Sequence, residues 1–328
     1  MFVIRRLLKN IGRYSVSLGL SLVCLTVAHA QAPRTLTALS YVERGNQRME
    51  KGEWERAIAD YGLAIATDPR VPQAYNNRGI ARQAEGDLEG ALADFNRAIG
   101  LDPRYLKAYH NRGLLRDARE EYDEAIADFS KALELDPRLA SAFANRANAR
   151  YAKGDFGGAL ADCDKTLALN RRSWLAHNTR GLVRQKQRDP DGAIADFNQA
   201  IAIGPSYAQG YYNRGNAYLF KGDMERALAD YTRAIALDPN FASAYINRGT
   251  LYGALGKLDQ AQADYDQAIE LQPRSAATYF NRGLVRLLQG RAAEAQEDFA
   301  QCLALDQKLK PDIEQAKQSL APSQYRER

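Results

Sequence analysis

A row of asparagines is the feature of this 328-residue sequence with the clearest capacity for binding chemistry. A carboxamide has an acceptor oxygen and two donor hydrogens, so it can pair with both the C=O and the N–H groups of another polypeptide backbone. The row is therefore a candidate site for an extended peptide. Its members stand 34 residues, or a multiple of 34, apart: Asn77, Asn111, Asn145, Asn213, Asn247 and Asn281.

A second regular feature is a pair of opposite charges. An arginine follows each asparagine, and an aspartate stands 16 residues after that arginine, as in Arg112 and Asp128. Matched charges at this spacing predict an Arg–Asp ion pair in every unit, which the planar guanidinium can make through two hydrogen bonds. We interpret the pairs as structural; the alternative is a charged binding stripe. The aspartates are Asp60, Asp94, Asp128, Asp162, Asp196, Asp230, Asp264 and Asp298.

No other group of residues predicts catalysis or a bound cofactor. The sequence has no nucleophile–base pair, no phosphate-binding loop and no Cys or His cluster with metal-ligand spacing. Cys163 and Cys302 lie four units apart and are expected to be small buried side chains without a bridge between them. We therefore expect no enzyme activity, no cofactor and no metal.

The elements that must position these side chains are repeated as well. With the Gly of Asn-Arg-Gly as position 8, eight units run without insertion from 38–71 to 276–309. Apolar positions 20, 24, 27 and 28 have helical spacing, Gly and Asp at positions 15 and 16 end one helix and cap the next, and Pro at position 32 ends the second. Gly at position 8 opposite Ala at position 20 predicts close helix axes.

These positions resemble the tetratricopeptide repeat (TPR), a 34-residue helix–turn–helix unit. The resemblance implies an all-α fold, a right-handed superhelical solenoid of antiparallel helix pairs, whose first helices line a concave groove. The asparagine row resembles the asparagine ladder of the TPR region of O-GlcNAc transferase, which holds extended peptides through their backbone. This resemblance therefore implies that the six asparagines bind peptide. A residue that was simply copied with each repeat is the open alternative.

Two further patterns qualify this prediction. Asn46, Asn77 and Lys107 match the dicarboxylate clamp of some TPR domains, but Val42 and Asn111 stand where the clamp has cations. The joint between the fourth and fifth units departs most from the repeat, so we expect looser packing there. The departures are Ala147, Cys163, Thr166, Arg171, His177 and Thr179.

The two ends of the chain do not follow the repeat. Residues 1–14 are basic, Ser15 to Val27 is an apolar run, and Ala28-His29-Ala30 is an A-x-A site, the layout of a secretory signal peptide. We expect cleavage before Gln31 and a periplasmic or secreted chain, with an uncleaved membrane anchor as the alternative. Residues 31–37 are a leader, and residues 310–328 are a capping helix and a polar tail.

Charge and architecture together set the expected function. Loss of residues 1–30 removes four of 45 basic residues and none of the 40 acidic ones, which leaves 41 basic and 40 acidic residues. This nearly neutral charge gives no electrostatic reason to expect binding to nucleic acid. We expect an exported scaffold that binds a protein or peptide in its groove without catalysis. The alternatives are a self-assembling structural solenoid, hence a homo-oligomer, and an accessory subunit of an envelope complex for secretion or polysaccharide export. A membrane is a partner only if the signal segment is uncleaved.

Overall fold

The computed structural model describes residues 37–320, and within this range every regular element is a helix. The predicted signal peptide, residues 31–36 of the leader and the tail from residue 321 lie outside the described residues. The first helix of each repeat, called an A helix here, is α1 Ala38–Glu50, α3 Pro72–Ala84, α5 Leu106–Ala118, α7 Ala140–Lys153, α9 Trp174–Lys186, α11 Ala208–Phe220, α13 Ala242–Ala254 and α15 Ala276–Leu288. The second, the B helix, is α2 Trp54–Thr67, α4 Leu88–Leu101, α6 Tyr122–Leu135, α8 Phe156–Leu169, α10 Pro190–Ile203, α12 Met224–Leu237, α14 Leu258–Leu271 and α16 Ala292–Leu305.

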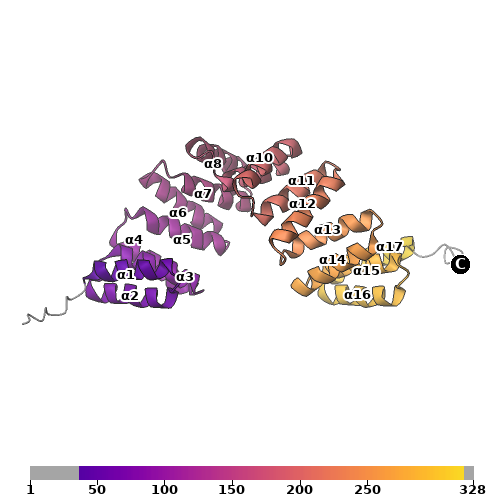
Figure 1. Cartoon of the computed structure of the whole chain (residues 1–328), viewed down its shortest axis with the longest axis horizontal. Coiled ribbons are helices and arrows are strands. Elements are labelled where there is room, and N and C mark those ends of the chain that lie inside the picture. Colours follow the sequence, from indigo (N-terminus) through magenta and orange to yellow (C-terminus); the bar gives the residue numbers. More distant parts are fainter. Residues whose placement is uncertain (1–36, 321–328) are drawn as a thin grey trace, which may run out of the picture.

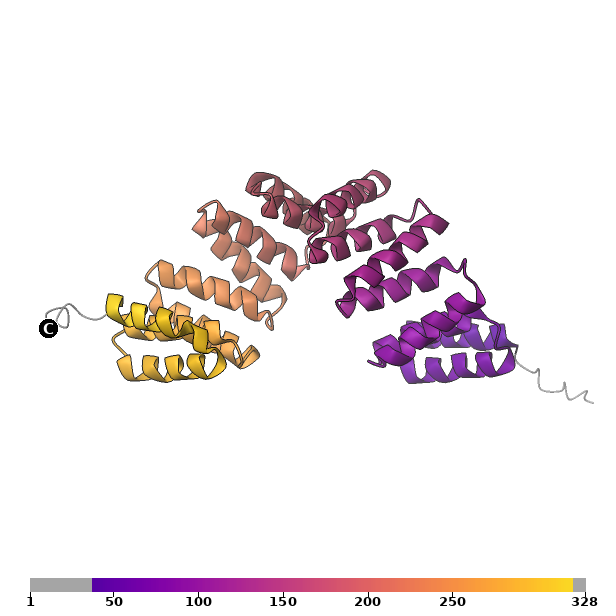
Figure 2. The same ribbon diagram turned by 180° about the vertical axis from the view of Figure 1, so that it is seen from behind.

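The repeats stack in chain order into an arch (Figure 1). The first repeat and the last repeat form its two feet, and α8 and α10 lie near its top, as the view from behind also shows (Figure 2). Each A helix packs on its own B helix, and each A helix after the first also packs on the B helix of the preceding repeat. The predicted all-α, superhelical repeat fold is therefore confirmed.

The turn between the A and B helices has the predicted chemistry in the repeats that have Asp at position 16, whereas the other repeats lack the side-chain cap. Gly86 adopts a φ of +86°, and Asp87 then caps α4 by accepting a 2.9 Å hydrogen bond from the Gly90 backbone N–H. A left-handed residue ends the A helix because its conformation cannot continue the helix, and glycine takes that conformation at least cost. Glu120 and Arg188 take the same left-handed place in the two repeats that lack this glycine, each with a φ of 61°.

The partner of the glycine at position 8 differs from the prediction. A β-carbon on this glycine would lie between 2.5 and 3.2 Å from the aromatic ring at position 24 in all seven repeats that have the glycine. The ring, not the alanine at position 20, therefore requires it. In the fourth repeat position 8 is Ala147 and position 24 is Cys163, and both are fully buried. The smaller side chain at position 24 makes room for the alanine.

Several departures at the joint between the fourth and fifth repeats have local hydrogen-bond partners. Thr166 is buried and its hydroxyl donates to the Asp162 carbonyl at 2.9 Å. His177 lies in the aromatic position, with Nδ1 3.2 Å from Asp196 Oδ1 and Nε2 3.2 Å from the Arg171 carbonyl. The Thr179 hydroxyl, by contrast, is buried without a hydrogen-bond partner among the described residues. The looser packing expected at this joint stays a prediction.

The C-terminal end of the stack is covered by a short helix. A 3-10 helix, Gln307–Leu309, leads into α17, Lys310–Leu320, whose Ile313 is fully buried against Phe299 and Cys302. Cys163 and Cys302 are buried free thiols, as expected from the sequence. None of the helices in residues 37–320 is long and apolar enough to cross a membrane.

Candidate functional site

The predicted Arg–Asp pairs are present in all eight repeats and are bidentate. Arg112 donates from Nε to Asp128 Oδ2 at 2.9 Å and from Nη2 to Oδ1 at 2.6 Å. Arg116, one turn later, adds a third bond to Asp128 Oδ2 at 2.7 Å. Asp128 is only 3% exposed, so its charge is neutralised inside the repeat.

The same arginines also join neighbouring repeats. Arg112 Nη1 donates to Asn96 Oδ1 on the preceding B helix at 2.6 Å, and an equivalent bond is made by each later arginine of the row. The hydrogen bond to Asp94 raises the pKa of Arg78 further, which keeps the guanidinium charged. Because carboxylate and guanidinium are bound to each other, the geometry favours the structural interpretation over a charged binding stripe.

The asparagine row lies on the A helices, but its amides also link the repeats. Asn111 Nδ2 donates to Asn76 Oδ1 of the preceding repeat at 2.9 Å, and Asn145 Nδ2 lies 3.1 Å from His110 Nε2. Burial lowers the pKa of His110, so the ring is neutral and can accept this bond. Such hydrogen bonds between repeats were not predicted. They use the Nδ2 group of the asparagine and leave its Oδ1 for other partners.

The remaining members show that the row is not uniform. Asn213 is 3% exposed; it donates to Asn178 Oδ1 and accepts from Gln209 Nε2, both at 3.0 Å. Both ends of the Asn213 amide are therefore used by its own repeat and the preceding one, which is less favourable for the predicted peptide contact than the geometry of Asn145 or Asn247. Asn281 makes no side-chain hydrogen bond within residues 37–320, since Ile246 stands where the other repeats supply an acceptor.

Three members of the row are held through Nδ2 and offer an acceptor to a ligand. Asn111, Asn145 and Asn247 are half-buried, and nothing within residues 37–320 donates to their amide oxygens. Asn247 is fixed through its Nδ2, which donates to Tyr212 Oη at 3.2 Å and to Asn216 Oδ1 at 2.9 Å. An amide that is anchored through its nitrogen presents its oxygen in a defined direction, and this suits the backbone N–H of an extended chain.

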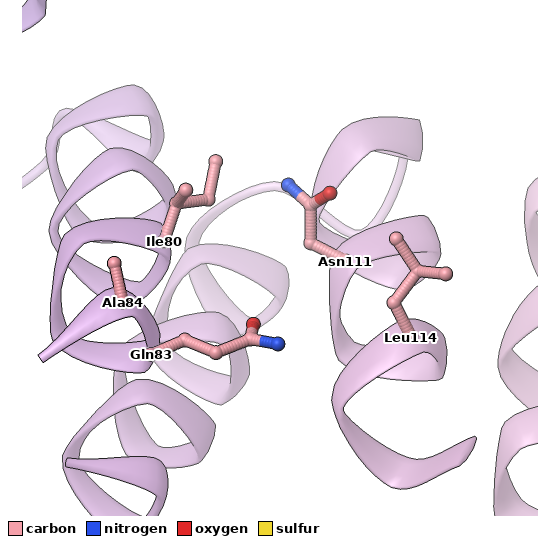
Figure 3. A pocket seen from close by; sticks show the side chains of 5 residues that line it. All are labelled: Ile80, Gln83, Ala84, Asn111 and Leu114. Carbon is pink, nitrogen blue, oxygen red and sulfur yellow. The ribbon is translucent and has the colours of Figure 1, made fainter. Parts of the chain in front are cut away.

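A shallow cavity of about 370 Å³ lies beside the row between α3 and α5. Ile80 and Ala84 form one wall, Leu114 stands on the opposite helix, and the amides of Gln83 and Asn111 extend into the gap between the helices (Figure 3). The cavity therefore combines an apolar surface with polar groups beside it, the composition that ligand sites in proteins usually have.

A hydrogen bond between the side chains at repeat positions 9 and 24 is connected to the asparagine row. Tyr61 Oη donates to Asn46 Oδ1 at 2.8 Å, and Asn77 Nδ2 donates to the same oxygen at 2.9 Å. Burial raises the pKa of Tyr61 to about 12, so this donor stays protonated at neutral pH. The sequence contains this signal: position 9 is polar where position 24 is Tyr and apolar where it is Phe. The polar residues are Asn46, Asn216 and Thr250, and the apolar ones are Ile80, Leu114, Leu182 and Leu284.

The clamp pattern finds no support in this geometry. Asn46 Oδ1 already accepts two hydrogen bonds, and Asn77 uses Nδ2 for one of them while its Oδ1 accepts from Asn76 at 2.9 Å. Val42 is buried, so it cannot contribute to a surface site. Residues 37–320 also contain no group of three or more His, Cys, Asp or Glu side chains that could hold a metal ion.

Comparison with protein families gives three profiles, all of the same repeat. A tetratricopeptide-repeat profile matches residues 72–105, 106–139, 208–241 and 242–275. A TPR-repeat profile matches 45–86 and 190–219, and a further tetratricopeptide-repeat profile matches 264–297. A search of curated proteins gives no match.

Solved structures with the same architecture include a tetratricopeptide-repeat protein from Parabacteroides merdae, with 21% identity, a TM-score of 0.60, and coverage of 79% of this chain and 98% of that one. The Cut9–Hcn1 hetero-tetramer of the APC/C matches with 16% identity and a TM-score of 0.65, over 86% of this chain and 56% of that one. YrrB, described as a TPR protein with an unusual peptide-binding site, matches with 26% identity and a TM-score of 0.45, over 56% and 95%. The first two of these likenesses establish the fold alone.

Proposed function

This chain belongs to the tetratricopeptide-repeat family, and we propose that it is a scaffold that binds a protein or an extended peptide along its A helices, without catalysis. The observation that carries the proposal is the set of anchored amides: Asn111, Asn145 and Asn247 are held through their nitrogens, and each leaves an oxygen without a donor within residues 37–320. A folded domain has its own N–H groups bonded internally, whereas an extended segment carries unpaired N–H groups along its length. The chemistry therefore favours an extended segment as the ligand.

The size of the interaction follows from the groups involved. Each neutral hydrogen bond contributes about 1 kcal/mol net, so amides alone give weak binding. An apolar side chain buried in the cavity beside Asn111 would add about 1.5 to 3 kcal/mol. Affinity in the micromolar range thus requires several amides and at least one apolar side chain of the ligand together.

The location of this activity rests on the first 30 residues. Their basic, apolar and small-residue order is the layout of a secretory signal, so we place the mature chain, from Gln31, in a periplasm or outside the cell. One feature disfavours end-to-end stacking in the self-assembling alternative. At the C-terminal end, α17 covers the apolar face of the last repeat that end-to-end stacking would use.

The test is capture of a partner with residues 31–328, followed by calorimetry of the purified pair. The test variant is Asn145→Ala with Asn247→Ala; the control is Gln199→Ala with Gln301→Ala, which removes two exposed amides from B helices. We expect the test variant to bind tenfold or more weakly and the control to match the wild type. Equal affinities in all three proteins would refute groove binding. Light scattering of the free chain would reveal a polymer if self-assembly were the function.

A further inference from the structure

A second cavity, of about 200 Å³, lies at the joint between the fourth and fifth repeats. Ala140 and Ala144 on α7 line one side, Trp174 and Leu175 at the start of α9 line the other, and Asn145 of the asparagine row borders it. The cavity therefore touches an asparagine that is held through its nitrogen and whose oxygen can bind a ligand.

The sequence gives this joint a large aromatic side chain at a position where the other repeats have smaller ones. Trp174 occupies position 1, where the other repeats have Ala, Pro or Leu, and it faces the small side chains of Ala140 and Ala144. The indole is 39% exposed, and its ring centroid lies 4.5 Å from that of Tyr207. Contact with Tyr207 fixes the indole, so it forms a rigid wall.

The lining of the cavity selects the chemistry of an occupant. None of its lining side chains carries a charge, and the polar ones are amides and hydroxyls. A charged side chain would lose its hydration there without gaining a counter-ion, and this is costly. An apolar side chain would lose only water contacts and would gain the indole face.

We propose that this cavity, called the Trp174 pocket here, is a specificity subsite of the groove that takes one aromatic or branched aliphatic side chain of the bound segment. The inference rests on the proposed function, because the segment reaches the pocket along the asparagine row. A backbone N–H of the segment donates to Asn145 Oδ1, while a neighbouring side chain enters between α7 and α9.

The first cavity predicts the spacing between two apolar side chains of the ligand. It lies between α3 and α5, two repeats before the Trp174 pocket, and Asn111 borders it. The A helices α3, α5 and α7 are in contact in turn, and packed helices lie about 8 to 10 Å apart, so two steps span about 16 to 20 Å across the helices. The first cavity also lies about seven residues further along its A helices, which adds about 10 Å along the helix axis. The direct distance is then about 19 to 23 Å, and an extended segment at about 3.3 Å per residue covers it with about six or seven residues. The ligand should therefore carry two apolar side chains at that spacing.

The pocket can be tested without knowing the natural partner, because the chain has only two tryptophans. In protein labelled with 5-fluorotryptophan, Trp54→Phe assigns the two fluorine resonances. Trp54 borders a separate surface hollow together with Glu53, Glu55 and Glu85, so its resonance reports binding elsewhere. The probes are N-acetyl-phenylalaninamide, N-acetyl-leucinamide and N-acetyl-lysinamide. The first two should shift the Trp174 resonance in a saturable way, and the lysine probe should not.

Blocking variants complete the test. Ser141→Leu, at an exposed position on the rim, and Ala144→Leu, inside the pocket, should abolish the shift, whereas Ser243→Leu, at the equivalent position of α13, should preserve it. Circular dichroism checks that each variant is folded, and Ser141→Leu suffices if Ala144→Leu unfolds. No shift with the apolar probes, an equal shift with lysine, or a shift that survives Ser141→Leu would overturn the proposal. These results are independent of partner binding, so failure of the pocket and failure of groove binding are distinguishable.

This spacing has its own measurement. In glycine–serine peptides, two phenylalanines about six or seven residues apart should bind about tenfold or more tightly than one phenylalanine, because each buried ring contributes separately. Two phenylalanines placed two residues apart are the matched control, since they cannot fill both cavities. If the two spacings bind equally, the two cavities do not act on one ligand.

Discussion

Phe129 fills the space that a side chain on Gly113 would need: its Cε1 lies 2.7 Å from the position that a β-carbon would take. The fourth repeat shows the alternative solution, in which Ala147 is buried opposite the smaller Cys163. Positions 8 and 24 are therefore one packing unit, and two apparent departures from the repeat compensate each other.

Gly113→Ala should destabilise the protein by about 1 to 3 kcal/mol, because the added methyl overpacks the core against Phe129. Adding Phe129→Cys should recover part of the loss, which a double-mutant cycle in urea measures as favourable coupling. Gly100→Ala, on an exposed face of α4 with nothing within 4 Å, is the control and should be neutral or slightly stabilising. Additive effects of the two core changes would contradict the packing unit.

Asp128→Ala should cost about 3 kcal/mol, because it leaves Arg112 and Arg116 half-buried without their counter-ion. Asp128→Lys should cost more, since it adds a repelling charge. The control is Asp123→Ala, whose exposed ion pair with Lys153 should contribute less than about 1 kcal/mol. Thermal melting by circular dichroism measures all three. Unchanged melting of the Asp128 variants, with weaker ligand binding, would instead favour a charged binding stripe.

Tyr231→Phe should lower stability by about 1 kcal/mol, because Asn216 Oδ1 loses a 2.7 Å hydrogen bond beneath the groove. The reverse change, Phe197→Tyr, should also destabilise, because Leu182 at position 9 cannot accept from the new hydroxyl. Phe197→Tyr combined with Leu182→Asn should restore stability relative to Phe197→Tyr alone, as measured by urea denaturation. If Tyr231→Phe stabilised the protein instead, the proposed hydrogen bond between positions 9 and 24 would not contribute to stability.

Export gives a prediction that needs only the mass of the protein. Protein recovered from a bacterial host's periplasm should begin at Gln31, since Ala28-His29-Ala30 fits a signal-peptidase site. Changing Ala28 and Ala30 to bulky residues should block processing and retain the chain in the membrane fraction. Intact-mass spectrometry decides between the two forms. A full-length chain from Met1 in the membrane fraction of the unmodified protein would favour the anchored alternative.

The sequence predicted what repeats within one unit. The helix pairs, the left-handed turn residues and the bidentate partner of Arg112 follow from a period of 34 residues and from charges 16 residues apart. What it did not predict depends on how one unit sits against the next. The bond from Asn111 to Asn76 spans 35 residues, and the Trp174 pocket forms only because α9 lies beside α7. Such offsets are set by the superhelical stacking, and only the covariation of positions 9 and 24 left a trace of them in the sequence.

Asn213 and Asn281 separate the two roles of the asparagine row. Asn213 is buried with both ends of its amide bonded, so Asn213→Ala should lower the melting temperature and cost about 1 to 3 kcal/mol, while the folded protein keeps its affinity for ligand. Asn281 has no internal side-chain bond within residues 37–320, so Asn281→Ala should change stability by less than about 0.5 kcal/mol. If the ligand reaches the last repeat, the same change should weaken binding severalfold, because one hydrogen bond contributes about 1 kcal/mol. Calorimetry with a captured partner measures the affinity of each variant, and melting curves measure its stability. Asn213→Ala should change only stability, and Asn281→Ala should change only affinity. If Asn281→Ala binds as tightly as the wild type, the binding site ends before the eighth repeat; if Asn145→Ala and Asn247→Ala also bind normally, the asparagines serve only to join the repeats.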